Sequence, residues 1–159
     1  MARYLHINRF EYDFIVLLTI NLKKSKKLKM PADAILFKAG KCKKLIPINA
    51  DWFYLRCASI LRRMYKRGPI GIGKLREMYG GRRRRAFRPR YYSIVADGLL
   101  IIVLKALSQA KMIKFVPGGR TLTYRAQRKI YRLAQIIAHV DREILAIKQK
   151  QLLAQQRNM

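Results

Sequence analysis

An amphipathic stretch from Asp51 to Gly68 is the feature that most limits how this chain can fold. Its apolar residues recur at i, i+4, i+7, i+8 and i+11, a spacing that places them along one side of an α-helix. They are Phe53, Cys57, Ile60, Leu61 and Met64. Asp51 suits an N-cap, and Gly68-Pro69 ends the helix because proline cannot continue it. The opposite side carries cations, so the sequence predicts a central helix with one buried face and one face toward negative charge.

A dense arginine run follows this helix. After Tyr79-Gly80-Gly81 come Arg82, Arg83, Arg84, Arg85, Arg88 and Arg90. Like charges at this density repel one another, so we expect an extended loop that a polyanion neutralises. The whole chain follows the same trend, because 36 Lys and Arg against 8 Asp and Glu leave a net charge of +28. Such self-repulsion opposes a compact state, and nucleic acid is the leading partner, ahead of an anionic membrane surface.

Other apolar patterns predict further helices and one hairpin around the central helix. Helices are expected over residues 8–22 and 93–109 and from Tyr124 onward, with short helical pieces at 32–37 and 74–79. Residues 112–116, a Pro-Gly-Gly turn and residues 120–123 predict a β-hairpin. The expected fold class is mainly α, with helices packed around the central amphipathic helix in a winged-helix-like arrangement with one small β-hairpin. We expect a single domain over residues 1–147 and a polar tail over 148–159.

The sequence offers no set of residues suited to enzyme chemistry or to metal binding. Eight acids and two histidines offer no paired carboxylates, no nucleophile with its base and no ligand set, so we predict no enzyme, no cofactor and no metal. Cys42 and Cys57 support no disulfide framework. The stretch from Gly68 to Leu75 approaches a phosphate-binding loop, but leucine replaces the hydroxyl residue that binds magnesium, so no nucleotide is expected. The apolar runs fall short of the roughly 20 residues that span a bilayer, so no membrane partner is expected.

Four motifs occur in one order along the chain: Leu22 to Pro31, Trp52 to Ser59, the glycine turn from Arg67 to Gly73, and Tyr79 to Arg82. Together they resemble the eukaryotic and archaeal small-subunit ribosomal protein nineteen family, the "e" type, over roughly residues 8–140. The resemblance implies a compact, mainly helical protein in the head of the small ribosomal subunit. Its partners would be small-subunit ribosomal RNA and neighbouring head proteins, and it would support RNA maturation and subunit assembly. Its location would be cytoplasmic, on the ribosome, and nucleolar during assembly in a eukaryote.

The candidate RNA-binding residues combine this resemblance with the charge pattern. The resemblance implies Arg56, Arg62 and the Tyr79–Arg82 turn, and the pattern adds cations of the central helix, the arginine run, the hairpin and the lysines after the first helix. The full set is Arg56, Arg62, Arg63, Lys66, Arg67, Lys74, Tyr79, Gly80, Gly81, Arg82, Arg83, Arg84, Arg85, Arg88, Arg90, Arg120, Lys26 and Lys27. Arg125, Arg128, Lys129 and Arg132 form a further basic cluster on one face of the last helix.

The helix expected after Ser93 departs from the family. It is apolar nearly all round, where the family has a polar helix with arginines, and this suggests altered packing or a protein neighbour. The alternative function is a winged-helix DNA-binding regulatory or architectural protein, which normally reads bases from one recognition helix. Charge that is spread over most segments favours burial in folded RNA instead.

Overall fold

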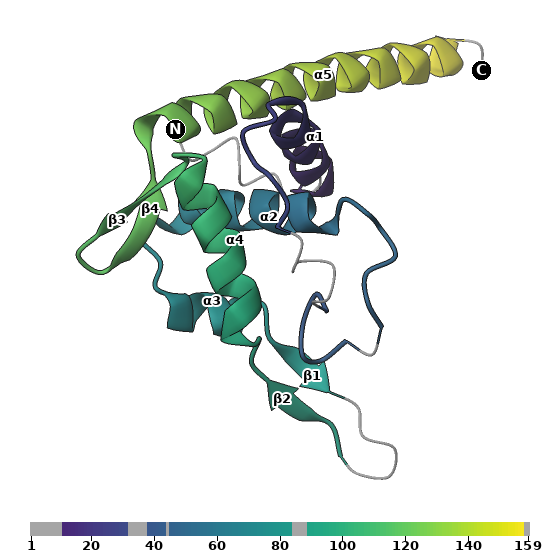
Figure 1. The fold of residues 1–159 in the computed structure, drawn as a ribbon. Helices are drawn as coiled ribbons and strands as arrows, with labels where there is room; N and C mark the ends of the chain where they lie inside the picture. Colours follow the sequence, from purple (N-terminus) through teal and green to yellow (C-terminus); the bar gives the residue numbers. More distant parts are fainter. Residues whose placement is uncertain (1–10, 32–37, 44, 84–88, 158–159) are drawn as a thin grey trace.

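The structure is a computed structural model that describes residues 11–31, 38–43, 45–83 and 89–157 (Figure 1). Its helices are α1 (Glu11–Lys24), α2 (Trp52–Arg67), α3 (Ile72–Met78), α4 (Asp97–Gln109) and α5 (Tyr124–Arg157). Two antiparallel strand pairs join β1 (Gly81–Arg83) to β2 (Tyr91–Ser93) and β3 (Ile113–Val116) to β4 (Gly119–Leu122). The predicted mainly α class with a small hairpin is confirmed, and the β1–β2 pair is an addition that the sequence did not predict.

Helix α2 lies at the centre, with α1, α4 and β4 packed against it (Figure 1). All five residues of the predicted apolar stripe are buried, namely Phe53, Cys57, Ile60, Leu61 and Met64. Gly68 ends the helix as predicted, with a φ of +77° that glycine adopts without a Cβ clash, and its N–H donates to the Met64 carbonyl. The described residues therefore share one core, built on the apolar face of α2.

Asp51 takes the N-cap position of α2, as predicted, but without the expected side-chain cap. Its side chain makes no capping hydrogen bond, because the carboxylate accepts from Lys23 Nζ at 2.8 Å instead. At the other end of α1, Glu11 pairs with Arg62 and lies 3.4 Å from Lys66, both on α2. These contacts join the end of α1 to the start of α2 and the start of α1 to the end of α2, so the two helices are antiparallel.

The β3–β4 hairpin forms the wing of a winged-helix-like unit with α2, α3 and α4. Ile70, between α2 and α3, exchanges two backbone hydrogen bonds of 3.0 Å with Arg120 at the edge of the hairpin. Gly119 makes this approach possible, since a Cβ there would lie 2.7 Å from the Ile70 carbonyl carbon. The glycine of the predicted turn therefore anchors the wing to the segment that follows α2.

Helix α4 begins at Asp97, four residues after the predicted start at 93. Ser93 pairs with Gly81 between β2 and β1, and the Val95 N–H donates to the Arg76 carbonyl, so the residues before Asp97 are extended. Most of the apolar surface of α4 is buried in the core, through Leu99, Leu100, Val103, Leu104, Ala106 and Leu107. Core packing thus accounts for most of the apolar character that the sequence shows here.

Helix α5 is the longest element, and in Figure 1 its C-terminal half projects beyond the body. Ala126, Ile130 and Ala134 are buried where its first turns cover α1. We expected an extended or frayed tail from Lys148, but the helix continues to Arg157, because Gln, Lys, Leu and Ala all favour a helix. The predicted helical pieces at 8–10 and 32–37 lie outside the described residues. Among the helices of the described chain, none has the length and apolar character needed to cross a bilayer.

Candidate nucleic-acid interface

Tyr79 lies against three residues of α2. The Arg56 Cζ is 4.4 Å and the Arg63 Cζ 4.3 Å from the centre of the tyrosine ring, and the hydroxyl is 2.8 Å from Ser59 Oγ. Positions 56, 59 and 63 share one helix face, because they are spaced by three and four residues. Cation–π contacts of this type are each worth about 0.5–2 kcal/mol. The cationic face of α2 is therefore organised around one aromatic ring.

Further hydrogen bonds fix the arginines of this cluster. Arg56 donates to the Ala39 carbonyl, and Arg63 Nη1 donates to the Met78 carbonyl at 3.2 Å. Burial lowers the pKa of the Arg56 guanidinium and raises the pKa of Tyr79, while the Ser59 hydrogen bond and the nearby arginines partly offset the shift of Tyr79. The Tyr79 phenol is therefore neutral at neutral pH, with two guanidinium groups against its ring.

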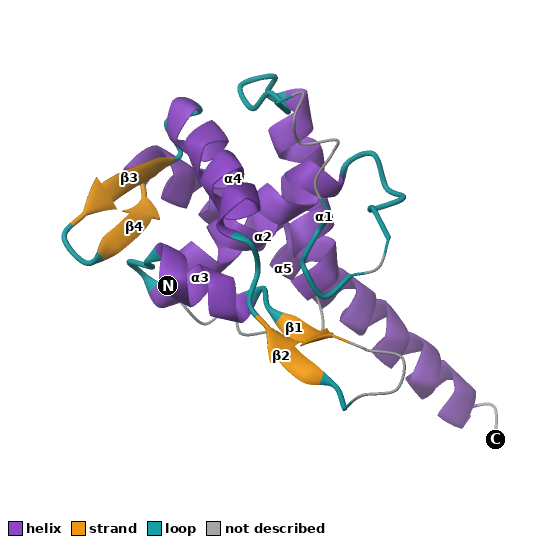
Figure 2. Ribbon diagram, turned by 60° about the horizontal axis from the view of Figure 1, so that its bottom comes forward, coloured by secondary structure: helices purple, strands orange, loops and turns teal. Residues whose placement is uncertain are grey.

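Residues 81–83 and 89–93, here called the arginine arm, extend from this cluster (Figure 2). A Cβ on Gly80 would lie 2.5 Å from the Tyr92 hydroxyl and 2.9 Å from the Ser93 carbonyl oxygen, so glycine is required at the base of the arm. The Tyr92 hydroxyl also donates to the Glu77 carbonyl. The arm therefore has a fixed base beside α3.

The arm carries the described part of the predicted arginine run. Arg82, Arg83 and Arg90 are exposed, whereas Arg84, Arg85 and Arg88 lie outside the described residues. We expected an extended loop throughout, but Arg82 pairs with Tyr92 and Arg83 with Tyr91 in the β1–β2 ladder. The two tyrosines favour a strand, which was the signal available in the sequence.

Arg62 lies on another side of α2. It is only 8% exposed and pairs with Glu11, so its buried guanidinium meets a carboxylate that is itself partly exposed at the surface. Lys66 lies beside the same carboxylate. This Glu11 contact was not predicted, because its partner is 51 residues away in the sequence.

The remaining predicted residues are distributed around the molecule. Arg67 donates to the Met78 sulfur at 3.3 Å, close to the Tyr79 cluster. Lys74 pairs with Glu77 at 2.9 Å on the surface of α3. On the wing, the Arg120 Cζ lies 5.7 Å from the centre of the Phe115 ring. The predicted set therefore includes residues of the Tyr79 cluster, the arm and separate surface positions.

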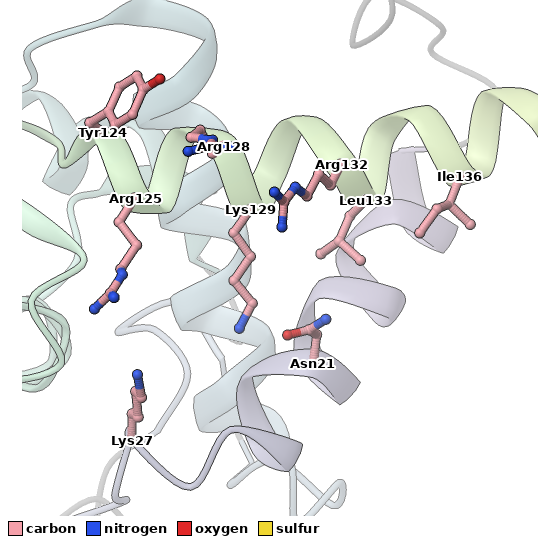
Figure 3. A pocket seen from close by; sticks show the side chains of 9 residues that line it. All are labelled: Asn21, Lys27, Tyr124, Arg125, Arg128, Lys129, Arg132, Leu133 and Ile136. Carbon is pink, nitrogen blue, oxygen red and sulfur yellow. The ribbon is translucent and has the colours of Figure 1, made fainter.

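Lys26 and Lys27 are exposed in the turn after α1, and Lys27 lies at a groove between α1 and α5 (Figure 3). The other residues that line the groove are Asn21, Tyr124, Arg125, Arg128, Lys129, Arg132, Leu133 and Ile136. The sequence indicated the basic face of the last helix but did not connect it with Lys27, which comes from a distant segment. The spacing of 125, 128, 129 and 132 was the available signal.

Sites for other chemistry are not apparent in the part of the chain that the structure describes. No group of three His, Cys, Asp or Glu side chains there could hold a metal ion. Cys57 is buried on α2, and burial raises the pKa of its thiol, so it stays protonated and unreactive at neutral pH. What the described surface offers is positive charge in defined positions.

Comparison with known proteins gives a consistent result. The family model for "Ribosomal protein S19e" matches residues 11–140. "Small ribosomal subunit protein eS19A" of Drosophila melanogaster is 42% identical over 123 residues, which is 77% of this chain and 79% of the relative. "Small ribosomal subunit protein eS19" of Myxine glutinosa is 41% identical over 125 residues, with 78% and 86% coverage. "Small ribosomal subunit protein eS19G" of Ascaris suum is 37% identical over 123 residues, with 76% and 83% coverage.

Proposed function

The chain belongs to the ribosomal protein S19e family, and from this premise we propose that it is a structural constituent of the small ribosomal subunit that binds ribosomal RNA. Its relatives are named as proteins of that subunit. The observation that carries the proposed RNA contact is the position of Arg56 and Arg63 over the Tyr79 ring, at the base of an arm with exposed arginines.

The arm would bind RNA by neutralising phosphates. Arginine suits this task because its planar guanidinium can donate two hydrogen bonds to one phosphate. The Tyr79 cluster and the base of the arm hold these charges in place before binding, which lowers the entropy lost when the complex forms. Tyr92 is about half exposed, so its ring is accessible to a base for stacking.

The finer assignments follow from the family and extend the proposal. We place the chain in the head of the small subunit, in contact with small-subunit RNA and neighbouring head proteins. There it would support RNA maturation and subunit assembly. It would act in cytoplasmic ribosomes, and in the nucleolus during assembly if the source is eukaryotic.

Helix α4 argues against the alternative of a DNA-reading regulator. In a winged-helix protein the corresponding helix enters the major groove and presents basic and polar side chains. The exposed residues of α4 are Asp97, Gly98, Ile101, Lys105, Ser108 and Gln109, with one acid and one base. A helix face without net charge is a poor match for the DNA backbone. This favours the proposed role as an RNA-binding constituent of the small subunit.

Replacement of Arg82 to Arg85 by alanine tests the proposal. We expect the fold to remain intact and the variant to be lost from small subunits, because the arm no longer neutralises phosphates. Sedimentation of cell extracts through sucrose gradients, before and after a high-salt wash, measures incorporation. The matched control replaces four cations outside the arm, which are exposed in the structure: Lys41, Lys105, Lys114 and Arg142.

Two outcomes would contradict different parts of the proposal. Normal incorporation of the arm variant would remove the arm from the RNA-binding surface. If the wild-type chain never sedimented with small subunits, or left them at modest salt, the ribosomal role itself would be contradicted.

A further inference from the structure

The groove between α1 and α5 brings cations together from two distant segments. Figure 3 shows Arg125 and Lys129 extending from α5 toward Lys27, which follows α1. An adjoining pocket shares these three residues and adds Lys111 from the turn after α4. Neither hollow is lined by an acidic side chain.

The groove cations lack counter-charges within the described part of the chain. The ion pairs there join other residues, and none includes Lys27, Arg125, Lys129 or Arg132. Burial lowers the pKa of Lys129, and the charge of Lys27 lowers this pKa further. The two like charges repel each other, and an anion bound between them would attract both and offset this repulsion.

We propose that this groove binds the phosphate backbone of an RNA strand, as a second site separate from the arginine arm. The inference rests on the proposed function, which places the chain against RNA. Arg125 and Arg132 are seven positions apart along α5, or about 10 Å at 1.5 Å per residue. This length exceeds the separation of neighbouring phosphates on one strand, so the row can contact at least two consecutive phosphates.

The other groove residues suit the same ligand. The Asn21 amide can donate to a phosphate or to a sugar hydroxyl, and Tyr124 at the groove is 73% exposed, so a base can stack on its ring. The Arg128 Cζ lies 5.7 Å from the centre of that ring, which places a cation beside the aromatic surface. Charge, hydrogen-bond donors and an aromatic ring therefore occur together, as in sites that track a nucleic-acid strand.

The groove and the arm lie at opposite ends of the body. In Figure 1 the first turns of α5 are at the top and β1–β2 at the bottom, with α2 and α4 between them. Ligands at the two sites therefore do not overlap. A chain with both sites occupied would hold two separate RNA segments together. A single continuous basic face would bind only one segment.

The double substitution Arg125→Gln with Lys129→Gln tests the groove. Its matched control is Lys105→Gln with Lys114→Gln, which removes two exposed cations from α4 and β3. The probe is a fluorescein-labelled RNA hairpin of about 30 nucleotides, followed by anisotropy between 50 and 200 mM KCl. Each lost phosphate contact should reduce the magnitude of the slope of log affinity against log salt by about 0.7–0.9. We therefore expect this slope to be smaller by about 1–2 in the groove variant, and by much less in the control.

A second readout tests whether one chain holds two RNAs. Donor-labelled and acceptor-labelled hairpins are mixed with a half-equivalent of protein, and energy transfer between them is measured. Wild-type protein should give transfer. The groove variant and an Arg82→Gln, Arg83→Gln arm variant should each still bind one hairpin but give no transfer.

The outcomes separate the two proposals. A groove variant with the salt slope of the control, or with normal energy transfer, would overturn the groove assignment. Poly-glutamate serves as a competing acidic probe in the same anisotropy assay. If the groove variant bound RNA like wild type but bound poly-glutamate more weakly than wild type, the assignment would be overturned in favour of an acidic protein segment. Failure of the wild-type chain to sediment with small subunits would instead overturn the proposed function. If the double variant does not fold, the exposed Arg132→Gln repeats the test with one charge removed.

Discussion

Helices α2 and α5 are both amphipathic and basic, yet their cations have different surroundings. In α2, Arg56 and Arg63 lie over the Tyr79 ring, and Arg62 is buried beside Glu11. These cations are therefore part of the packing of the fold. Removing their partners should affect stability before it affects binding.

In α5 the cations that line the groove have no counter-charge among the described residues. Their charge is available to a ligand, so removing them should affect binding with little effect on stability. The comparison teaches that the same spacing of Arg and Lys on a helix can serve packing in one place and ligand binding in another, depending on what the rest of the chain brings next to it.

The largest expected effect comes from Trp52→Ala, which removes a core side chain at the start of α2. The variant tests whether both basic surfaces depend on the packing of α2. Trp52 is 9% exposed and packs edge-on against Phe53, with ring centres 6.1 Å apart. Its loss should lower the free energy of unfolding by about 3–5 kcal/mol, measured by urea denaturation. Tyr12→Ala, at a position 74% exposed, is the control and should change it by less than about 0.5 kcal/mol. A Trp52→Ala protein of normal stability that fails to bind RNA would mean that the indole stacks on RNA instead.

An intermediate effect is expected from Glu11→Gln. This variant tests whether the cations of α2 contribute to stability more than the cations of α5 do. The variant leaves the buried Arg62 without its counter-charge, so we expect a loss of about 1–3 kcal/mol in chemical denaturation. Arg132→Gln on α5 is the comparison and should stay within about 0.5 kcal/mol of wild type. Equal losses in the two variants would remove the distinction between packing cations and ligand-binding cations.

The smallest effect is expected from Tyr79→Phe, which keeps the ring under Arg56 and Arg63 but removes the hydrogen bond to Ser59. The loss should be about 1 kcal/mol. Burial raises the pKa of Tyr79 above its ordinary value of 10.0, so the unfolded chain ionises first as the pH rises. The stability that this residue contributes is therefore complete below pH 10 and decreases above it. The variant should lose less stability than wild type between pH 9 and 11; identical pH profiles would show that the buried phenol contributes nothing.

The core was predictable because its signal is local. The apolar period of α2, the glycine that ends it and the turn of the β3–β4 hairpin are each encoded within a few neighbouring residues, and the structure contains all three. The sequence did not predict β1 and β2, because strands of three residues within and beside an arginine run give too short a pattern.

The parts of the site that could not be predicted depend on contacts between distant segments. Asp51 fits an N-cap locally, and only the fold brings Lys23 to its carboxylate. In the same way, the basic face of α5 was visible in the sequence, but only the packing of α1 on α5 places Lys27 opposite it. Local pattern therefore indicated which residues carry charge, while tertiary contacts decided what each charge faces.

The antiparallel pairing of α1 with α2 has a consequence for folding during synthesis, because α1 is made before the helix on which it packs. Glu11 and Arg62 are 51 residues apart, and a ribosome adds about 5–20 residues per second, so Arg62 is made about 3–10 s after Glu11. During this interval Phe14, Leu18 and Leu22 of α1 lack the helix that buries them. Helix α1 therefore cannot bury its apolar side against α2 until α2 has been made.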